Sequence, residues 1–247
     1  MPFGINPKPA DVIAAIQGTR KIREDSPRTS CRHRGCCCRA GCPNMYYSEY
    51  LGLREGYLDR MPEPWRAEFL VQCVRYYLTR QFVDGKVSEK PCLLLSPDNR
   101  CLAYADRPLK CRTYGLVPSA MHRLVVNSVS KDTGIEKKDL PLCVQCPFVR
   151  VADEDRAAYP DDVVPEEQIA RMEKEIRAKD QSLGISKRFQ DLGLSFLTLH
   201  DWHVMCEMGE EWMAKLTPIR AEKGPEWKSK FIDDLRQAVF STLGEKP

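Results

Sequence analysis

Apolar and polar positions recur along most of the chain with the period of an α-helix. The clearest stretch is Pro64–Phe82, whose apolar residues lie three or four positions apart. Further helices are predicted over Pro9–Arg20, Ser48–Arg60, residues 165–180, Ser186–Lys215 with a break at Gly193, and Pro225–Leu243. Only Leu93–Leu95 and Arg123–Val129 read as strands. The expected fold class is therefore mainly α with long loops.

Cysteines divide the chain near residue 150. Eleven of the 12 lie between Cys31 and Cys146, and the remaining one is Cys206. Residues 151–167 hold seven Asp or Glu and two Pro against one Arg, a composition typical of an exposed connection. We therefore expect a cysteine-rich domain over residues 1–150, wrapped around metal, and a helical C-terminal region over residues 151–247.

The composition narrows the class of protein. Lys and Arg number 38 against 35 Asp and Glu, and the resulting net charge of +3 is too small to indicate nucleic-acid binding by itself. No run of about 18 apolar residues could span a membrane, and residues 1–21 lack the pattern of a secretory signal. The expected compartment is a reducing cytoplasm, where clustered cysteines indicate metal binding or catalysis rather than disulfides.

The first cysteine cluster is a basic, glycine-containing segment. Gly35 and Gly41 allow the backbone conformations and close approach that a loop around an ion requires. Packing in a core does not explain the cluster, because the same stretch carries one histidine and three arginines. The candidate metal ligands here are Cys31, Cys36, Cys37, Cys38 and Cys42.

Two further cysteine sets follow in the same half of the chain. The turn signal at residues 96–99 predicts that Cys101 folds back toward Cys92, and Cys111 comes after a turn or short helix that Pro108 begins. The third set is Cys143 and Cys146, a C-x-x-C pair that directs two sulfurs to one metal or cluster.

The second set resembles the signature of the YkgJ-type cysteine-cluster family, also described as zinc/iron-chelating or CxxCxxCC proteins. The matching stretches are Pro91–Leu95, Cys101–Tyr104 and Arg107–Arg112, and in the first cluster Cys31, Gly35, Cys37 and Cys38 fall on the pattern. The resemblance covers roughly residues 28–150 and implies metal binding. It says nothing about residues 151–247.

The chain departs from that family pattern at Arg34. The pattern has its second cysteine there, and an arginine stays protonated, so it cannot bind a metal. Cys36 or Cys42 lies close enough in sequence to supply the missing thiolate.

The number of thiols allows two kinds of metal centre. The ten cysteines that remain without Cys73 and Cys206 suffice for one or two [4Fe–4S] clusters, or for two tetrahedral zinc sites. Three adjacent cysteines favour iron–sulfur, because neighbouring side chains diverge and a cluster accepts more widely spaced sulfurs than one zinc ion. Cys146–Pro147 is also similar to a ligand followed by proline in bacterial ferredoxins.

Arginines accompany the cysteines. Four thiolates leave a cluster or a zinc ion negatively charged, and guanidinium groups offset that charge and donate hydrogen bonds to sulfur. We therefore expect Arg34, Arg107 and Arg112 to contact the cofactor. The alternatives are that these arginines form a solvated face or dock an acidic partner.

Other cysteine and histidine positions indicate packing rather than chemistry. Cys73 lies on the apolar stripe of the Pro64–Phe82 helix. His200, His203 and Cys206 share one helical face, but apolar and aromatic residues surround them in the sequence, so we expect a core. No phosphate loop, dinucleotide fingerprint or nucleophile elbow is present.

Three hypotheses about function follow. The preferred one is an iron–sulfur protein that transfers electrons or serves an anaerobic enzyme, with a redox or enzyme partner protein. The second is a zinc-stabilised structural or interaction module. The third is a metal-dependent group-transfer enzyme, although no acid–base pair can be assigned.

Overall fold

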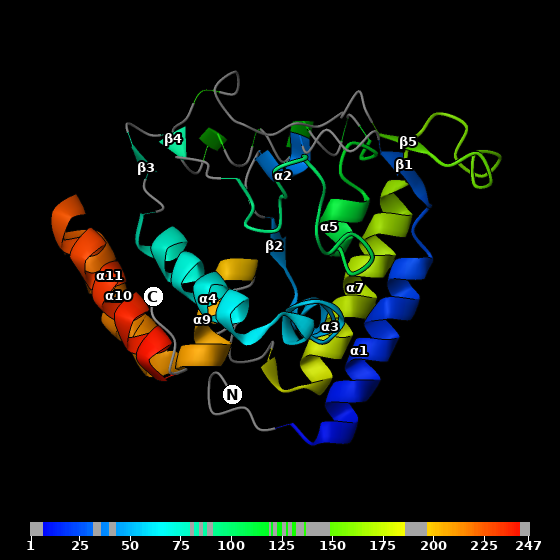
Figure 1. Cartoon of the computed structure of the whole chain (residues 1–247). Coiled ribbons are helices and arrows are strands. Elements are labelled where there is room, and N and C mark those ends of the chain that lie inside the picture. Colours follow the sequence, from blue (N-terminus) through cyan, green and yellow to red (C-terminus); the bar gives the residue numbers. More distant parts are fainter. Residues whose placement is uncertain are drawn as a thin grey trace.

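Helices make up most of the chain in the computed structural model (Figure 1). The structure describes residues 7–31, 36–39, 43–79, 82–83, 86–87, 91–118, 149–185 and 197–242, with single positions between 120 and 136. The helices are α1 (Pro9–Glu24), α2 (Cys36–Arg39), α3 (Tyr47–Gly56), a 3-10 turn η2 (Leu58–Arg60), α4 (Glu63–Thr79), α5 (Leu109–Arg112), α7 (Glu166–Ser182), α9 (Leu199–Met208), α10 (Glu210–Glu222) and α11 (Pro225–Thr242).

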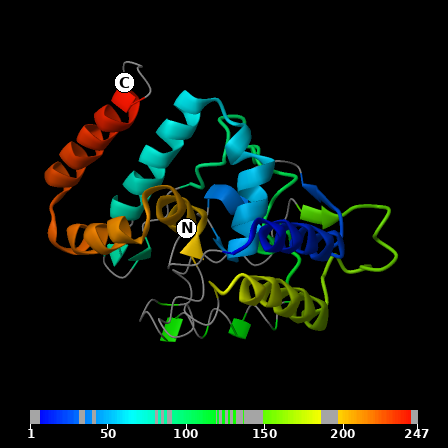
Figure 2. The same ribbon diagram turned by 90° about the horizontal axis from the view of Figure 1, so that it is seen from below.

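Helices α1 and α7 lie side by side at one edge of the molecule (Figures 1 and 2). Pro9 occupies the first turn of α1, where its missing N–H is not needed. Ala15, Ile16 and Ile22 of α1 are buried, and α7 buries Met172 and Ile176. The amphipathic patterns of both helices are thus satisfied, and this confirms the helices predicted for these two segments.

Helix α3 occupies the centre and contacts α1 and α7 with one side and α9 with another. Helix α4 packs on α9, α10 and α11, which form the opposite edge of the molecule. Thr198 and Asp201 form a capping box that begins α9, and Gly209, at a φ of +86°, separates α9 from α10. One hydrophobic cluster extends from α1 through α3 and α4 to α9, so residues on both sides of position 150 share a core.

Three short antiparallel ladders tie distant segments together. Strand β1 (Thr29–Cys31) pairs with β5 (Val149–Val151), β2 (Asn44–Met45) with β6 (Leu197–Thr198), and β3 (Phe82–Val83) with β4 (Lys86–Val87). In the first ladder Cys31 lies opposite Val149. The first two ladders therefore connect the cysteine-rich half of the chain to residues far along the sequence.

The mainly α prediction is confirmed, but both predicted strands differ. The described residues of Arg123–Val129 are helical, so the β-propensity of that run does not decide its conformation. Of Leu93–Leu95, only Leu95 forms an isolated bridge, with Cys101. The helix expected over Ser186–Lys215 with a break at Gly193 is broken at Gly209 into α9 and α10 in the part that the structure describes, and Gly193 itself lies outside the described residues. None of the helices in the described ranges is long and apolar enough to cross a membrane.

Candidate functional site

Four of the ten predicted ligands line one pocket. They are Cys38 of α2, Cys92 and Cys101 of the loop that precedes α5, and Cys111 of α5. The pocket encloses about 380 Å³ of space, including its opening to solvent. Its other walls are apolar side chains and one cation, the guanidinium of Arg107; the apolar residues are Pro43, Met45, Leu53, Leu94, Ala103, Pro108 and Leu199. Three chain segments, α2, the loop with Cys92 and Cys101, and α5, thus bring four cysteines to one largely apolar pocket.

The first and second cysteine clusters are joined by a backbone hydrogen bond. The amide N of Cys92 donates to the carbonyl O of Cys38 at 2.7 Å. Both residues are nearly buried, with 9% of Cys38 and 8% of Cys92 exposed. This hydrogen bond holds the backbones of Cys38 and Cys92 next to each other, so their proximity does not depend on a bound group.

The turn predicted at residues 96–99 brings Cys101 back toward Cys92. The hydroxyl of Ser96 accepts from the amide of Arg100 at 3.0 Å, and Asn99 adopts a φ of +64°. The amide of Leu102 then donates to the carbonyl of Leu94 at 2.8 Å. The turn chemistry read from the sequence is therefore confirmed in detail.

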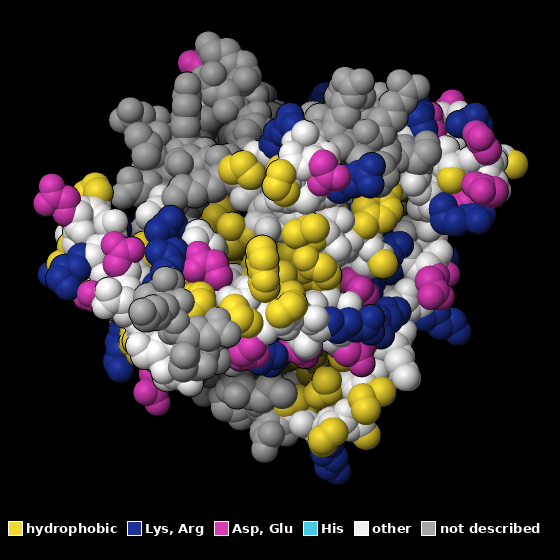
Figure 3. Space-filling model, viewed as in Figure 1, with side chains coloured by type: hydrophobic (Ala, Val, Ile, Leu, Met, Phe, Trp, Pro, Cys, Tyr) yellow, Lys and Arg dark blue, Asp and Glu magenta, His cyan; other side chains and the backbone are white. Residues whose placement is uncertain are grey.

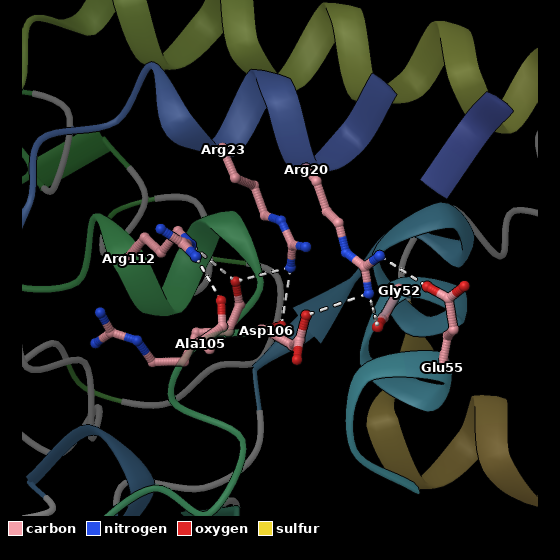
Figure 4. A network of polar contacts seen from close by, with 8 residues as sticks. Arg20, Arg23, Gly52, Glu55, Ala105, Asp106 and Arg112 are labelled. Atoms are coloured by element: carbon pink, nitrogen blue, oxygen red, sulfur yellow. Dashed lines mark hydrogen bonds and ion pairs between the residues drawn. The ribbon is translucent and has the colours of Figure 1, made fainter. Parts of the chain in front are cut away.

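The segment before Cys111 is held by two of the arginines that the sequence singled out. Arg107 stacks its guanidinium on the Tyr104 ring, 3.6 Å from the ring centroid, and donates from Nε to the Tyr104 carbonyl at 3.1 Å. Arg112 donates from Nη2 to the carbonyl of Ala105 at 2.6 Å and from Nε to that of Arg107 at 3.2 Å (Figure 4). Burial lowers the pKa of Arg112 to about 10.

These contacts give the two arginines different positions relative to the pocket. Arg107 lines the pocket itself and can face a bound anion. Arg112 instead donates hydrogen bonds to carbonyls of the loop that leads to Cys111. The structure therefore places Arg107 where a cofactor contact is possible, and gives Arg112 a backbone-holding position.

The same segment is fastened to α1 and α3 by two buried charged residues. Arg23 of α1 donates from Nη1 to the carbonyls of Asp106 and Arg107, at 2.9 and 3.1 Å. Glu49 of α3 accepts from the amide of Leu109, the first residue of α5, at 2.6 Å. Burial raises the pKa of Glu49 and lowers that of Arg23, and their opposite charges partly offset both effects.

A small residue lets this segment approach α3. A Cβ atom at Gly56, the last residue of α3, would lie 2.1 Å from Oδ2 of Asp106. Asp106 in turn lies 3.6 Å from Nη2 of Arg20 (Figure 4). A side chain at position 56 would therefore force the Asp106 carboxylate away from its place between α3 and Arg20.

The remaining predicted site residues cannot be placed in the pocket from the described side chains. Cys31 lies at the end of β1 and Cys36 and Cys37 in α2, and only their backbones are described. Arg34, Cys42, Cys143 and Cys146 lie outside the described residues. Among the described residues, the four pocket cysteines included, no group of three or more His, Cys, Asp or Glu side chains forms a site for a metal ion.

The cysteine and histidine positions assigned to packing do form a core. Cys73 is fully buried in α4, and burial, together with the nearby Cys92, raises its pKa well above the usual range. His203 donates or accepts at Nδ1 with the Tyr50 hydroxyl at 3.1 Å, and His200 stacks on Tyr76 with ring centroids 3.7 Å apart. Desolvation lowers the pKa of His203 to about 3, so its ring is neutral.

The surface that carries the pocket elements is apolar in its middle. In the view of Figure 3, hydrophobic side chains gather where Figure 1 places α2, β2 and α5, and charged side chains of both signs lie around them. Leu102, directly after Cys101, is 47% exposed. The mouth of the cysteine pocket is thus bordered by apolar surface.

Arg23 and Glu49 were not predicted as functional residues, although the sequence carries a signal for each. Val12, Ile16, Thr19 and Arg23 follow one another at spacings of four, three and four, so the arginine continues an apolar stripe. Glu49 lies at the third position of α3, where a carboxylate reaches back to the amide of Tyr46, at 3.1 Å. The signal for Arg23 is a charged residue on a stripe of buried positions. The signal for Glu49 is an acidic residue in the first turn of a helix.

No protein-family model, curated protein or solved structure matches the chain. The resemblance of the cysteine spacing to the YkgJ-type family therefore stays a prediction.

Proposed function

We propose that the chain is a metalloprotein in which Cys38, Cys92, Cys101 and Cys111 bind one [4Fe–4S] cluster. The single observation that carries the proposal is the convergence of these four thiols, from three chain segments, on one pocket. Four thiolates are the full ligand set of such a cluster, and the six other predicted cysteines remain available for a second one.

The chemistry of the pocket walls fits this group. Apolar walls keep water away from the sulfurs, and Arg107 supplies a positive charge beside the anionic centre that four thiolates create. A cluster supplies reversible one-electron transfer when it is bound. In the cytoplasm that the sequence predicts, thiols stay reduced, and we propose that the cluster serves electron transfer to a partner protein or an anaerobic enzyme.

Both a [4Fe–4S] cluster and a tetrahedral zinc ion take four thiolates, and of the two we propose the cluster. A cube with an iron at each of four corners accepts more widely spaced sulfurs than one tetrahedral ion does.

The test is metal and acid-labile sulfide analysis of the full chain after anaerobic purification. We expect at least four iron ions and four sulfide ions per chain, and absorbance at about 400 nm, as is typical of such clusters. Cys92→Ser, Cys101→Ser and Cys111→Ser should each lose most of that iron and absorbance.

Cys206→Ser is the matched control. Cys206 lies in α9, near Tyr47 and Tyr50 of α3, and it does not line the pocket. It should keep the iron content of the wild type. A colourless chain that carries zinc and no iron, even from anaerobic cells, contradicts the proposal and favours the zinc-stabilised module.

A further inference from the structure

The segment that carries Arg107 and Cys111 is fixed by an arginine outside the pocket. Arg23 is 2% exposed and comes from α1, more than 80 residues earlier in the chain. Its Nη1 donates to two consecutive carbonyls, those of Asp106 and Arg107, and Figure 4 shows the guanidinium pointing at them from α1. Burying a guanidinium is costly unless it is well bonded, so this contact is a specific one.

Three arginines together bond the carbonyls of four consecutive residues, 104–107. Arg107 reaches residue 104, Arg112 reaches residues 105 and 107, and Arg23 reaches residues 106 and 107. Arg107 and Arg112 belong to the same segment, whereas Arg23 comes from a different helix, α1, whose Arg20 also lies 3.6 Å from Asp106. Removing Arg23 therefore leaves the local bonds and the Arg20 ion pair in place and takes away the hydrogen bonds that hold carbonyls 106 and 107 to α1.

The other end of the segment has a matching anchor. Pro108 follows the two carbonyls that Arg23 binds, and the next amide, that of Leu109, donates to Glu49. The segment between α1 and α3 is thus held at carbonyls on one side of Pro108 and at an amide on the other. Cys111 lies two residues farther on, in the single turn of α5.

We infer that Arg23 is a positioning residue for the metal centre: by binding the carbonyls of Asp106 and Arg107, it sets where the Arg107 guanidinium and the Cys111 thiol meet the pocket. This inference rests on the proposed function. Residues that orient ligands without touching the metal typically change metal affinity by about 10–100-fold when they are replaced.

Two substitutions separate the geometry from the charge. Arg23→Lys keeps the positive charge but offers a single, differently placed donor group, whereas Arg23→Met removes both donors and charge. Ile232→Ala is the matched control, because Ile232 is equally buried, lies in α11, which packs on α4, and does not line the pocket. All three substitutions should lower the free energy of unfolding. Only the two substitutions of Arg23 should also free the carbonyls of Asp106 and Arg107 from α1.

The measurements are iron per folded chain, the electron paramagnetic resonance spectrum of the reduced protein and its reduction potential. We expect both Arg23 variants to lose about tenfold in metal affinity and to change the spectrum. Arg23→Met should also lower the reduction potential, because a nearby positive charge is gone. Ile232→Ala should keep the spectrum and potential of the wild type while its melting temperature falls.

A second readout needs no metal. In the metal-free chain, amide hydrogen exchange of residues 109–112 should accelerate in Arg23→Met and not in Ile232→Ala, while α7 exchanges as before. Loaded Arg23 variants with the spectrum, potential and iron content of the wild type overturn this inference and leave the proposed function standing. A wild-type chain without iron instead overturns the proposed function.

Discussion

Helix α3 joins the molecule by two sides that differ in chemistry. Toward α1, α5 and α7 it meets charged groups that bind backbone atoms: Glu49 accepts from α5, and Asp180 of α7 accepts from the amides of Tyr47 and Ser48 at 2.9 and 2.8 Å. Toward α9 it meets rings: Tyr47 lies 4.8 Å from Trp202 between centroids.

The difference separates geometry from bulk stability. Charged groups that bond backbone atoms have a defined direction and fix the loop that carries Cys111, whereas stacked rings contribute buried area with little directional demand. The polar side should therefore control metal binding, and the aromatic side should control the free energy of unfolding. Substitutions on each side can break or sharpen this distinction.

The largest effect is expected from Trp202→Ala. Trp202 is 3% exposed, contacts both tyrosines and donates from Nε1 to the carbonyl of Met45 at 3.0 Å. Truncation should lower the free energy of unfolding by about 3–5 kcal/mol, measured by urea denaturation. Iron per folded chain should be unchanged. Trp227→Ala, at a 40% exposed position, is the control and should cost far less; a loss of iron without loss of stability in Trp202→Ala would contradict the distinction.

The next effect concerns pH on the aromatic side. Because the pKa of His203 is lowered from 6.5 to about 3, the folded state binds fewer protons than the unfolded state between these values. Its contribution to stability is present above pH 6.5 and is lost as pH falls, by about 1.4 kcal/mol per unit. His203→Gln should therefore gain stability relative to the wild type as pH is lowered from 6.5 to 5. If the free energies of unfolding of the two proteins changed in parallel with pH, His203 would not be shielded from solvent and this prediction would be wrong.

The smallest effect has the opposite sign and lies on the polar side. Burial raises the pKa of Asp180 from 3.8 to about 6, so the folded state binds an extra proton between these values. The stabilising contribution of its protonation is complete below pH 3.8 and is lost as pH rises through 6. Relative to Asp180→Asn, the wild type should gain about 1.4 kcal/mol per unit as pH falls from 6 to 5. Urea titrations at several pH values measure this, and a wild type that loses stability relative to the variant would refute it.

Much of the architecture follows from local patterns in the sequence. The helices that begin at Pro9, Glu63, Glu166 and Pro225 were predicted with close boundaries, because apolar spacing and proline positions are local signals. The turn between Cys92 and Cys101 was also predictable, since Ser96 and Asn99 encode it. The helical state of the residues described near Arg123 was not, because β-propensity is easily overridden by context.

The candidate site was predictable in its thiols but not in its supports. Cysteine spacing indicated Cys38, Cys92, Cys101 and Cys111, and the structure brings these four to one pocket. Arg23, Glu49 and Asp180 act across separations of 60 residues or more, and no local pattern tells which backbone group a buried charge will meet. The cysteine spacing in the sequence indicates the candidate ligands, whereas the tertiary fold determines which residues position them.

The ladder between β1 and β5 has a consequence for how the cysteine-bearing excursion is assembled. It joins Cys31 to Val149, so the ends of a loop of more than a hundred residues meet through backbone pairing and the burial of Val149 and Val151. Closing a loop of that length costs about 4 kcal/mol of chain entropy. Contacts within the chain already offset that cost, so closure of this loop does not have to be supplied by the metal centre that we propose.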